Sequence, residues 1–198
     1  VTTNITNGVA FETGTFPASG AAAQALGGEP LKAETSLSYS LGLVLQPVDR
    51  LYLTIDAYQI EIDDRIVLSS NLNIAGNQAA QALLASLGIT GVTSARYFNN
   101  AIDTRTRGVD VVGSYSIPFD ASTLGLNASY NYNKTEVTRI APNPAALDAL
   151  GANLQRMGRD ERGRIEEGAP RDKFAFTGDW SLEHWGFNGG ITRYGRFT

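Results

Sequence analysis

Two unusually long stretches of alternating apolar and polar residues, both within residues 35–68, constrain the fold of this chain more than any other feature. Every second residue from Leu37 to Leu45 is leucine or tyrosine, and Leu51, Leu53 and Ile55 begin a second alternating stretch. A period of two predicts β-strands with one apolar and one polar face. Strands of soluble proteins average about 5–6 residues, whereas a tilted strand that crosses a bilayer needs roughly 9–11. Because both stretches are close to the longer figure, we predict a hairpin from the wall of a membrane barrel.

Four later segments repeat the alternation, so six strands are predicted. They cover residues 109–117, 124–133, 174–183 and 187–192. The turns near Asp49, Asp120 and Trp185 are short, whereas residues 71–93 and 141–169 form long connections. Short and long connections alternate, as they do in outer-membrane barrels with short turns on one rim and long loops on the other. The predicted fold class is all-β, an antiparallel up-and-down meander forming part of a transmembrane β-barrel, with short helices in the long loops.

Aromatic residues are predicted to mark the boundary of the membrane. Four of them cluster near the short-turn rim, as an aromatic girdle would: Tyr52, Phe119, Trp180 and Trp185. Four tyrosines fall on the apolar faces of the strands, where we expect them to meet lipid rather than to stack on sugar: Tyr39, Tyr115, Tyr130 and Tyr132.

Short helices are predicted before the hairpin and in the first long connection. Residues 21–26 favour a helix that Gly27 and Gly28 end. In residues 80–87, apolar side chains recur at the spacing of one helix face, and Gly88 follows as a stop.

The second long connection opens with a marked helix start. We predict Asn143 as the N-cap, Pro144 as the first helical residue and Gly151 just past the end. Residues 156–167 are charged and polar, so we expect a solvated loop there.

Two features of the strands remain open at this stage. Residues 4–11 suggest the end of a preceding strand with a turn at Asn7 and Gly8. The apolar positions change parity between Ala57 and Tyr58, which indicates either a bulge or the end of the membrane zone.

Composition excludes several classes of protein. Charged residues make up 18%, below the roughly 25% of soluble domains, which fits a chain with an unwetted face. The net charge of −4 provides no basic footprint, so no nucleic-acid partner is expected. The absence of cysteine excludes a disulfide scaffold, a cysteine zinc site and a cysteine nucleophile. No apolar run approaches the roughly 18 residues of a transmembrane helix, so no helical membrane span is expected, and the residues from Val1 onward are not expected to form a signal peptide.

Four segments, taken in order, resemble the TonB-dependent outer-membrane receptor family. They are residues 25–36 (ALG followed by PLKAETS), 56–66 (DAYQIEIDDRI), 99–110 (NNAIDTRTRGVD) and 168–174 (GAPRDKF). Their order and spacing are similar to the C-terminal half of such a receptor's barrel, from about residue 21 onward. The resemblance implies that residues 1–198 are a partial barrel without the plug domain, the short TonB-contacting box and the terminal aromatic residue of the family. The family barrel has about 22 strands.

The resemblance also implies a function. A parent receptor of this kind sits in the outer membrane of a Gram-negative bacterium, in contact with its lipid. It imports a large, scarce nutrient such as a siderophore, cobalamin or an oligosaccharide, and its plug couples import to the TonB complex. On this view the long loops hold the cargo, and no residue is expected to be catalytic, to bind a cofactor or to ligate a metal.

Several charged residues are candidate contacts for a ligand in the lumen or loops. An acidic cluster could form a calcium site or contact a ligand in the lumen. Alternatively, its members are solvated charges on a strand that leaves the membrane. We favour solvated charges, because no calcium-loop spacing is present. The cluster consists of Asp56, Glu61, Asp63 and Asp64. Arg105 and Arg107 share one side of a strand and either meet anionic cargo or pair with carboxylates on neighbouring strands, and we favour pairing. Gly108 marks a kink or a close approach.

Three other functions compete with the receptor hypothesis. A soluble all-β module that binds carbohydrate or another ligand would bury the apolar faces between two sheets, with Leu37, Leu41, Leu126 and Phe176 in one dry core. A passive porin or an autotransporter barrel would share the same wall. An enzyme is least supported, because the single histidine, His184, lies in a turn and no nucleophile motif is present. A wall segment by itself has open edges, so self-association is expected.

Overall fold

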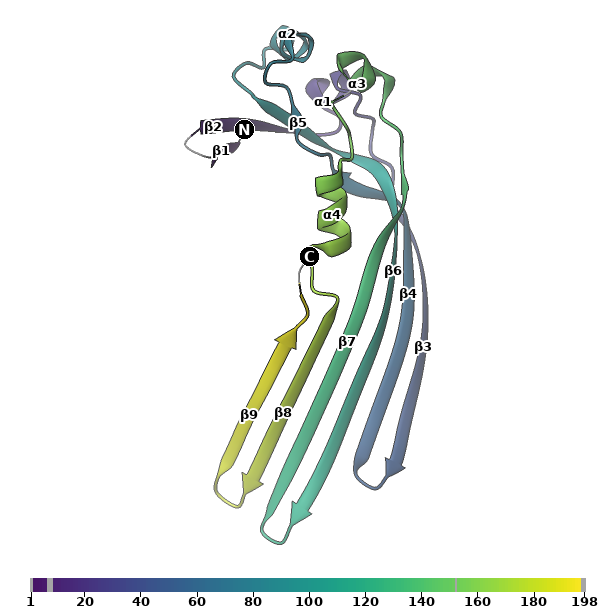
Figure 1. The fold of residues 1–198 in the computed structure, drawn as a ribbon. Helices are drawn as coiled ribbons and strands as arrows, with labels where there is room; N and C mark the ends of the chain where they lie inside the picture. Colours follow the sequence, from purple (N-terminus) through teal and green to yellow (C-terminus); the bar gives the residue numbers. More distant parts are fainter. Residues whose placement is uncertain (1, 7–8, 152, 197–198) are drawn as a thin grey trace. The chain divides into compact units, whose positions relative to one another are not determined.

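The computed structural model describes residues 2–6, 9–151 and 153–196. The chain divides into two compact units, each made of three segments (Figure 1). One unit, which we call the loop unit, comprises Val1–Ser36, Ile62–Thr104 and Val137–Gly163. The other, which we call the strand unit, comprises Leu37–Glu61, Arg105–Glu136 and Arg164–Thr198. The predicted long connections thus fall largely in the loop unit, and the predicted hairpins fall in the strand unit.

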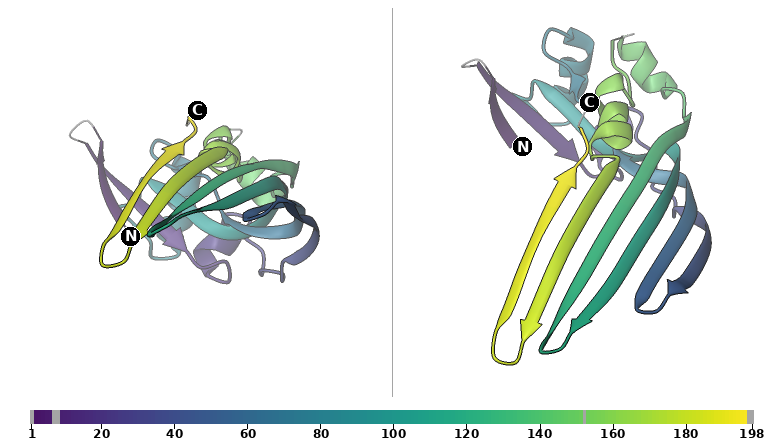
Figure 2. Two further views of the ribbon diagram at one scale, coloured as in Figure 1. Left: turned by 90° about the horizontal axis from the view of Figure 1, so that it is seen from below. Right: turned by 60° about the horizontal axis from the view of Figure 1, so that its bottom comes forward.

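Six long strands supply the strand unit, as predicted. They are β3 (Thr35–Val48), β4 (Leu51–Leu68), β6 (Ser94–Phe119), β7 (Ser122–Ile140), β8 (Asp172–Leu182) and β9 (Gly186–Tyr194). Neighbours in the sheet follow chain order, because β3 pairs with β4, β4 with β6, and β6 through β9 in turn. The three hairpin turns lie at the same end of this unit (Figure 1), and Figure 2 shows the order of the strands from two further directions.

The faces of these strands follow the sequence pattern. In the antiparallel register, Tyr130 lies opposite Phe174, and Phe176 opposite Ile191, so apolar residues share one face, which we call the apolar face. Leu41 is 79% exposed, and Leu37 and Phe176 are also exposed. The dry core between two sheets that the soluble module requires is therefore not present in the described part of the chain, and the partial-barrel fold class is confirmed.

Exposed aromatic rings stand close to the hairpin turns. All four residues of the predicted girdle are exposed, namely Tyr52, Phe119, Trp180 and Trp185. The ring of Trp180 lies 6.5 Å from that of Phe187, measured between ring centroids, so neighbouring strands place their aromatic side chains together. His184 lies in the exposed turn between β8 and β9, as predicted.

The loop unit contains short strands and helices. These are β1 (Thr2–Thr6), β2 (Val9–Phe16), β5 (Leu72–Asn73), α1 (Ala21–Ala25), α2 (Gln78–Ser86) and α3 (Ala145–Leu150), and α4 (Arg159–Glu167) begins there. The first residues of β6 pair with β5 in antiparallel fashion and with β2 in parallel fashion. The parallel pair makes the nine-stranded sheet mixed, whereas the sequence predicted only antiparallel pairing.

The buried core of the protein lies in the loop unit. Leu26, Leu84 and Leu147, from the neighbourhoods of α1, α2 and α3, pack with Ile74 and Tyr97. Tyr97 is completely buried, its hydroxyl donates to the Leu26 carbonyl at 3.1 Å, and burial raises its pKa. The long connections are therefore ordered by hydrophobic packing of their own.

The helix predictions are confirmed in two cases and corrected in a third. Helices α1 and α2 are followed by Gly27 and Gly88, both with positive φ, as expected of helix stops. In α3, however, the N-cap is Pro144 and not Asn143, whose amide group instead donates to Asp148 and to the Leu154 carbonyl. The Asn143 side-chain oxygen, which a helix cap would use, accepts instead from the Arg156 N–H at 2.9 Å.

The predicted solvated loop at residues 156–167 also needs correction. Residues 159–167 form helix α4, which has no buried residue, so the expected exposure is right but the loop is wrong. Arg156 is buried, with 8% of its surface exposed. None of the helices in the described part of the chain is long and apolar enough to span a membrane.

The open questions on the strands are partly answered. The predicted turn at Asn7 and Gly8 lies outside the described residues. Near Ala57, β4 continues as one strand from Leu51 to Leu68. The parity change therefore lies within one strand, and its cause, a bulge or the end of the membrane zone, stays a prediction.

Candidate functional site

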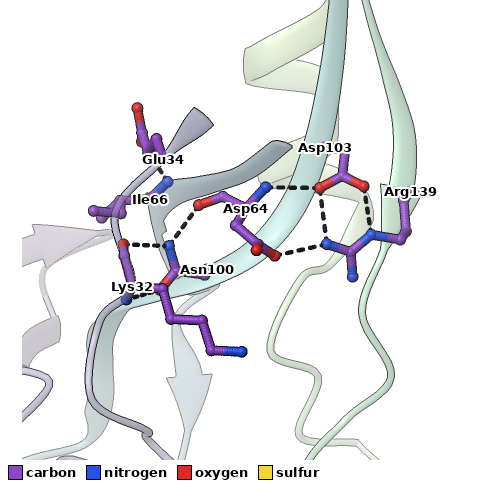
Figure 3. Close-up of polar contacts among 7 residues, drawn as sticks. All are labelled: Lys32, Glu34, Asp64, Ile66, Asn100, Asp103 and Arg139. Atoms are coloured by element: carbon purple, nitrogen blue, oxygen red, sulfur yellow. Dashed lines mark hydrogen bonds and ion pairs between the residues drawn. The ribbon is translucent and has the colours of Figure 1, made fainter. Parts of the chain in front are cut away.

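A guanidinium group joins three neighbouring strands in the loop unit (Figure 3). Arg139 of β7 donates to both carboxylate oxygens of Asp103 of β6, with Nη2 2.8 Å from Oδ1. The same Nη2 donates to Asp64 Oδ1 of β4 at 2.9 Å. Fork-shaped pairing of this kind combines two charge-assisted bonds with a fixed orientation. We call Asp64, Asp103 and Arg139 the arginine clamp.

The clamp holds an unusual backbone conformation. Asp64 has a φ of 51°, in the left-handed region that non-glycine residues rarely adopt. Its N–H donates to Asp103 Oδ1 at 2.9 Å, and its carbonyl accepts from the Asn100 side chain. The Asn100 amide also exchanges hydrogen bonds with the backbone of Lys32, at 2.8 and 3.1 Å. Because the N–H, the carbonyl and a carboxylate oxygen of Asp64 are all hydrogen-bonded, its strained conformation is held by local contacts.

The electrostatics of the clamp favour its charged form. The Asp103 side chain is only 16% exposed, and hydrogen bonds from Arg139 hold the pKa of its carboxyl below its usual range. The same contacts raise the pKa of Arg139. Asp103 and Arg139 are therefore both charged in the neutral pH range, and the clamp holds β4, β6 and β7 together at this point.

A polar cavity of about 320 Å³ opens beside the clamp. Arg139 and Asp64 form part of its lining, together with Lys32, Asn99 and Arg156. Asn99 and Arg156 are more than nine-tenths buried, and each has one side-chain polar atom without a hydrogen-bond partner. Because it adjoins the clamp and is lined by charged side chains, we take this cavity as the candidate small-molecule site of the loop unit.

A second polar arrangement continues the apolar face of the strand unit. Arg105 Nε donates to Glu61 Oε1 at 2.7 Å, and Arg107 Nε donates to Gln59 Oε1 at 2.7 Å. Both arginines lie an even number of residues before Val109 on one strand, so they share its face. We call the following residues the polar row: Gln59, Glu61, Arg105, Arg107, Lys134 and Glu136.

Comparison with known protein families decides between the possible barrels. The family model of the TonB dependent receptor-like β-barrel matches residues 3–198. The chain belongs to this family. A search among curated proteins found no match to the chain. Members of the family are transporters of the Gram-negative outer membrane, so the chain is part of a receptor barrel and no observation favours an enzyme.

The four residues of the predicted acidic cluster do not form one site in the structure. Glu61 pairs with Arg105, and Asp64 belongs to the clamp, whereas Asp63 is exposed. Asp56 lies on the face of β4 opposite to Glu61. Its carboxylate is so close to Gly42 of β3 that a Cβ at residue 42 would clash with it. No three histidine, cysteine, aspartate or glutamate side chains come together as a metal site within the described residues.

Of the two arginines predicted to pair with carboxylates or to meet cargo, Arg105 pairs with the Glu61 carboxylate, whereas Arg107 donates to the amide oxygen of Gln59. Contact of Arg105 or Arg107 with cargo stays a prediction. At Gly108, the next residue along the strand, the predicted close approach is found, but the neighbouring group is a side chain and not backbone. A Cβ at Gly108 would overlap the ring of Tyr58 on the adjacent strand.

Sequence reasoning missed four residues of the receptor's loop unit: Asn99, Asp103, Arg139 and Arg156. Asn99 and Asp103 lie inside the family-like segment at residues 99–110, which is the one signal that pointed toward them. Arg139 and Arg156 sit in polar stretches without a recognisable motif. Their contacts depend on which strands and loops become neighbours, and that depends on the fold.

Proposed function

We propose that this chain is part of an active-transport receptor in the outer membrane of a Gram-negative bacterium. The receptor imports a large, scarce nutrient of the siderophore–iron, cobalamin or oligosaccharide class, and the energy comes from the TonB complex through a plug domain of the parent protein. One observation carries the proposal: a sheet of six long strands with an exposed apolar face, in a chain that the receptor family model matches over residues 3–198.

The exposed apolar face supports contact with outer-membrane lipid. Leu37, Leu41 and Leu43 on β3 are each at least half exposed, which is costly in water and favourable in a bilayer. On the same face, the polar row begins where the apolar residues end. A change from apolar to charged side chains along one face is expected where strands leave the hydrocarbon layer.

The packed loop unit supports a role for the long connections in cargo capture. Its core of buried side chains, from Leu26 to Leu154, gives the loops a fixed structure, and the polar cavity beside Arg139 offers groups for a ligand. Binding residues are commonly found on loops that a rigid scaffold positions.

Uptake by cells tests this function. Cells that lack the endogenous gene are complemented with the receptor, in strains with and without a functional TonB complex. Labelled ferric siderophores, cobalamin and oligosaccharides are offered separately. We expect uptake of one class that disappears without TonB. Uptake that persists without TonB would support a passive porin instead.

Behaviour in detergent tests the membrane environment. Size-exclusion chromatography with light scattering is run with and without detergent, followed by thermal unfolding. We expect order only in micelles, or only as oligomers in their absence, since the open edges and the apolar face need cover. A detergent-free monomer with a cooperative unfolding transition would contradict membrane residence.

A further inference from the structure

The polar row of the strand unit lies on the face that borders lipid, not on the face that would line a lumen. Arg107 is two residues from Val109 on β6, and Lys134 is two residues from Tyr132 on β7. Because side chains two positions apart on a strand share a face, both cations extend the apolar face beyond its last apolar residues. Water in a barrel's lumen would account for charges on the inner face, but it does not account for these.

The row begins at the height where the hydrocarbon layer ends. The apolar positions of β6 run from Ile117, near the hairpin turn, to Val109, which spans about 26 Å along the strand at ~3.3 Å per residue. With a tilt of about 40°, Arg107 lies roughly 25 Å from Ile117 along the membrane normal, which is the height of the apolar band of such barrels. Tyr132 on the neighbouring strand is 39% exposed, and tyrosine is enriched at membrane interfaces. Arg107 therefore stands at the height of lipid head groups.

The register of β6 and β7 brings the two cations together. The hydroxyl groups of Thr106 and Thr135 lie 2.8 Å apart, and a second contact, four residues further along β6, keeps the same antiparallel register. In this register Arg107 lies opposite Lys134. Side chains directly opposite each other have Cβ atoms about 4.5–5.5 Å apart. A guanidinium and an ammonium on such a pair are close enough to contact one anionic group.

Arg107 has no carboxylate partner in the described part of the chain, whereas the other two cations of the row each pair with a glutamate. The Nε of Arg107 donates to the amide oxygen of Gln59 at 2.7 Å, which leaves its two terminal NH2 groups for an external acceptor. Lys134 donates one of its three hydrogens to Glu136 and keeps two. A guanidinium with both NH2 groups available is the group that binds phosphate in bidentate fashion.

The charges on this face of the strand unit favour an anion. The polar row holds three cations and two carboxylates, so it carries one net positive charge. Asp172 of β8 and Arg193 of β9 share the face, since they lie opposite Tyr132 and Phe174, and their charges offset each other. Anionic head groups attract basic side chains at this height of a bilayer.

We propose that Arg107 and Lys134 hold the phosphate group of a lipid whose acyl chains lie against the apolar face of β6 and β7. The terminal NH2 groups of Arg107 donate to two phosphate oxygens, and the Lys134 ammonium donates to a third. The long connections of such barrels are extracellular, so the lipid belongs to the outer leaflet. The choice of leaflet rests on the proposed function, whereas the phosphate contact rests on the strand unit alone.

Two matched lipids test the proposal. The protein in detergent micelles is titrated with dioleoylphosphatidic acid and with dioleoylglycerol, which have the same acyl chains and differ by the phosphate group, and bound lipid is counted by native mass spectrometry. We expect phosphatidic acid to bind about tenfold more tightly. Equal binding of the two lipids would overturn the proposal. Displacement of phosphatidic acid by an equal concentration of inorganic phosphate would also overturn it, because the site would then be one for free phosphate.

Four variants assign the contact. Arg107→Gln should remove most of the preference for phosphatidic acid, Arg107→Lys should retain part of it, and Lys134→Gln should reduce it a few-fold. Lys173→Gln is the matched control, because Lys173 lies opposite Asn131 on the other face of the sheet and the variant removes the same charge. We expect the control to keep the full preference. An Arg107→Gln variant that keeps the full preference, or a Lys173→Gln variant that loses as much as Arg107→Gln, refutes the site.

The outcome separates this inference from the proposed function. Equal binding of both lipids, together with TonB-dependent uptake of a nutrient, refutes the phosphate contact and leaves the receptor function in place. A preference for phosphatidic acid that depends on Arg107, without TonB-dependent uptake, supports the contact and refutes active transport.

Discussion

A single arginine placed on either face of β3 tests the orientation of the barrel wall. Leu41 lies on the apolar face and is 79% exposed, whereas its neighbour Ser40 points to the other face. If the apolar face meets lipid, Leu41→Arg puts a charge into hydrocarbon and Ser40→Arg does not. The two variants differ by one position in the chain and introduce the same side chain.

The expected cost follows from the depth of Leu41. The alternating residues run from Leu37 to Leu45, which spans about 26 Å along a strand at ~3.3 Å per residue. With a tilt of about 40°, the span across the membrane is roughly 20 Å of an apolar band about 25 Å tall. Leu41 is the middle residue, so it lies near the midplane, where an arginine costs about 2–4 kcal/mol. We expect about 3 kcal/mol for Leu41→Arg and less than about 1 kcal/mol for Ser40→Arg.

Equilibrium unfolding in lipid vesicles measures the difference. The protein is unfolded with denaturant, and the fluorescence of Trp180 and Trp185 reports folding. We expect the free energy of unfolding to fall for Leu41→Arg and to change little for Ser40→Arg. Leu45→Arg, on the same face as Leu41 but at the turn end of the apolar stretch, provides a depth control with a cost of about 0–1 kcal/mol. Equal losses for Leu41→Arg and Ser40→Arg would refute the assignment of the lipid-facing side.

Three further predictions concern the clamp, the strand contact and the core. Asp103→Asn should lower the free energy of unfolding by about 1 kcal/mol at pH 7, because the bond to the half-exposed Arg139 loses its charge. Since the folded-state pKa of Asp103 is lowered, this difference should be constant above about pH 5, begin to fall below about pH 4 and vanish once the pH is below the folded-state pKa. A pH-independent difference in a urea titration would contradict this. Gly108→Leu should lower the free energy of unfolding by about 1–3 kcal/mol, because the new side chain displaces Tyr58. The double variant Gly108→Leu, Tyr58→Ala should regain part of this stability. A Gly108→Leu variant as stable as the parent protein would rule out the close contact. Leu84→Ala should cost about 2–5 kcal/mol, measured by thermal unfolding, because the side chain is 1% exposed, and a loss below 1 kcal/mol would show that the loop core is loosely packed.

The strands of this protein could be predicted because their pattern is local. Alternation along β3 or β7 depends only on neighbouring residues, and a strand with one lipid-exposed face keeps the pattern unbroken over its whole length. The helix stops at Gly27 and Gly88 were predictable for the same reason, since a positive φ favours glycine whatever the surroundings. The N-cap was not, because the Asn143 side-chain oxygen accepts from the N–H of Arg156, 13 residues further along the chain.

The candidate site depended on tertiary structure. Arg139 and Asp103 are 36 residues apart, and Asp64 lies 75 residues from Arg139, so only the pairing of three strands makes them a clamp. Arg156 was read as solvated because charged residues usually are, yet the packing of the loops buries it. The sequence by itself determined which residues form strands, which face is apolar and which connections are long. The fold decided which polar side chains from distant segments share one buried space, because such contacts leave no periodic trace in the chain.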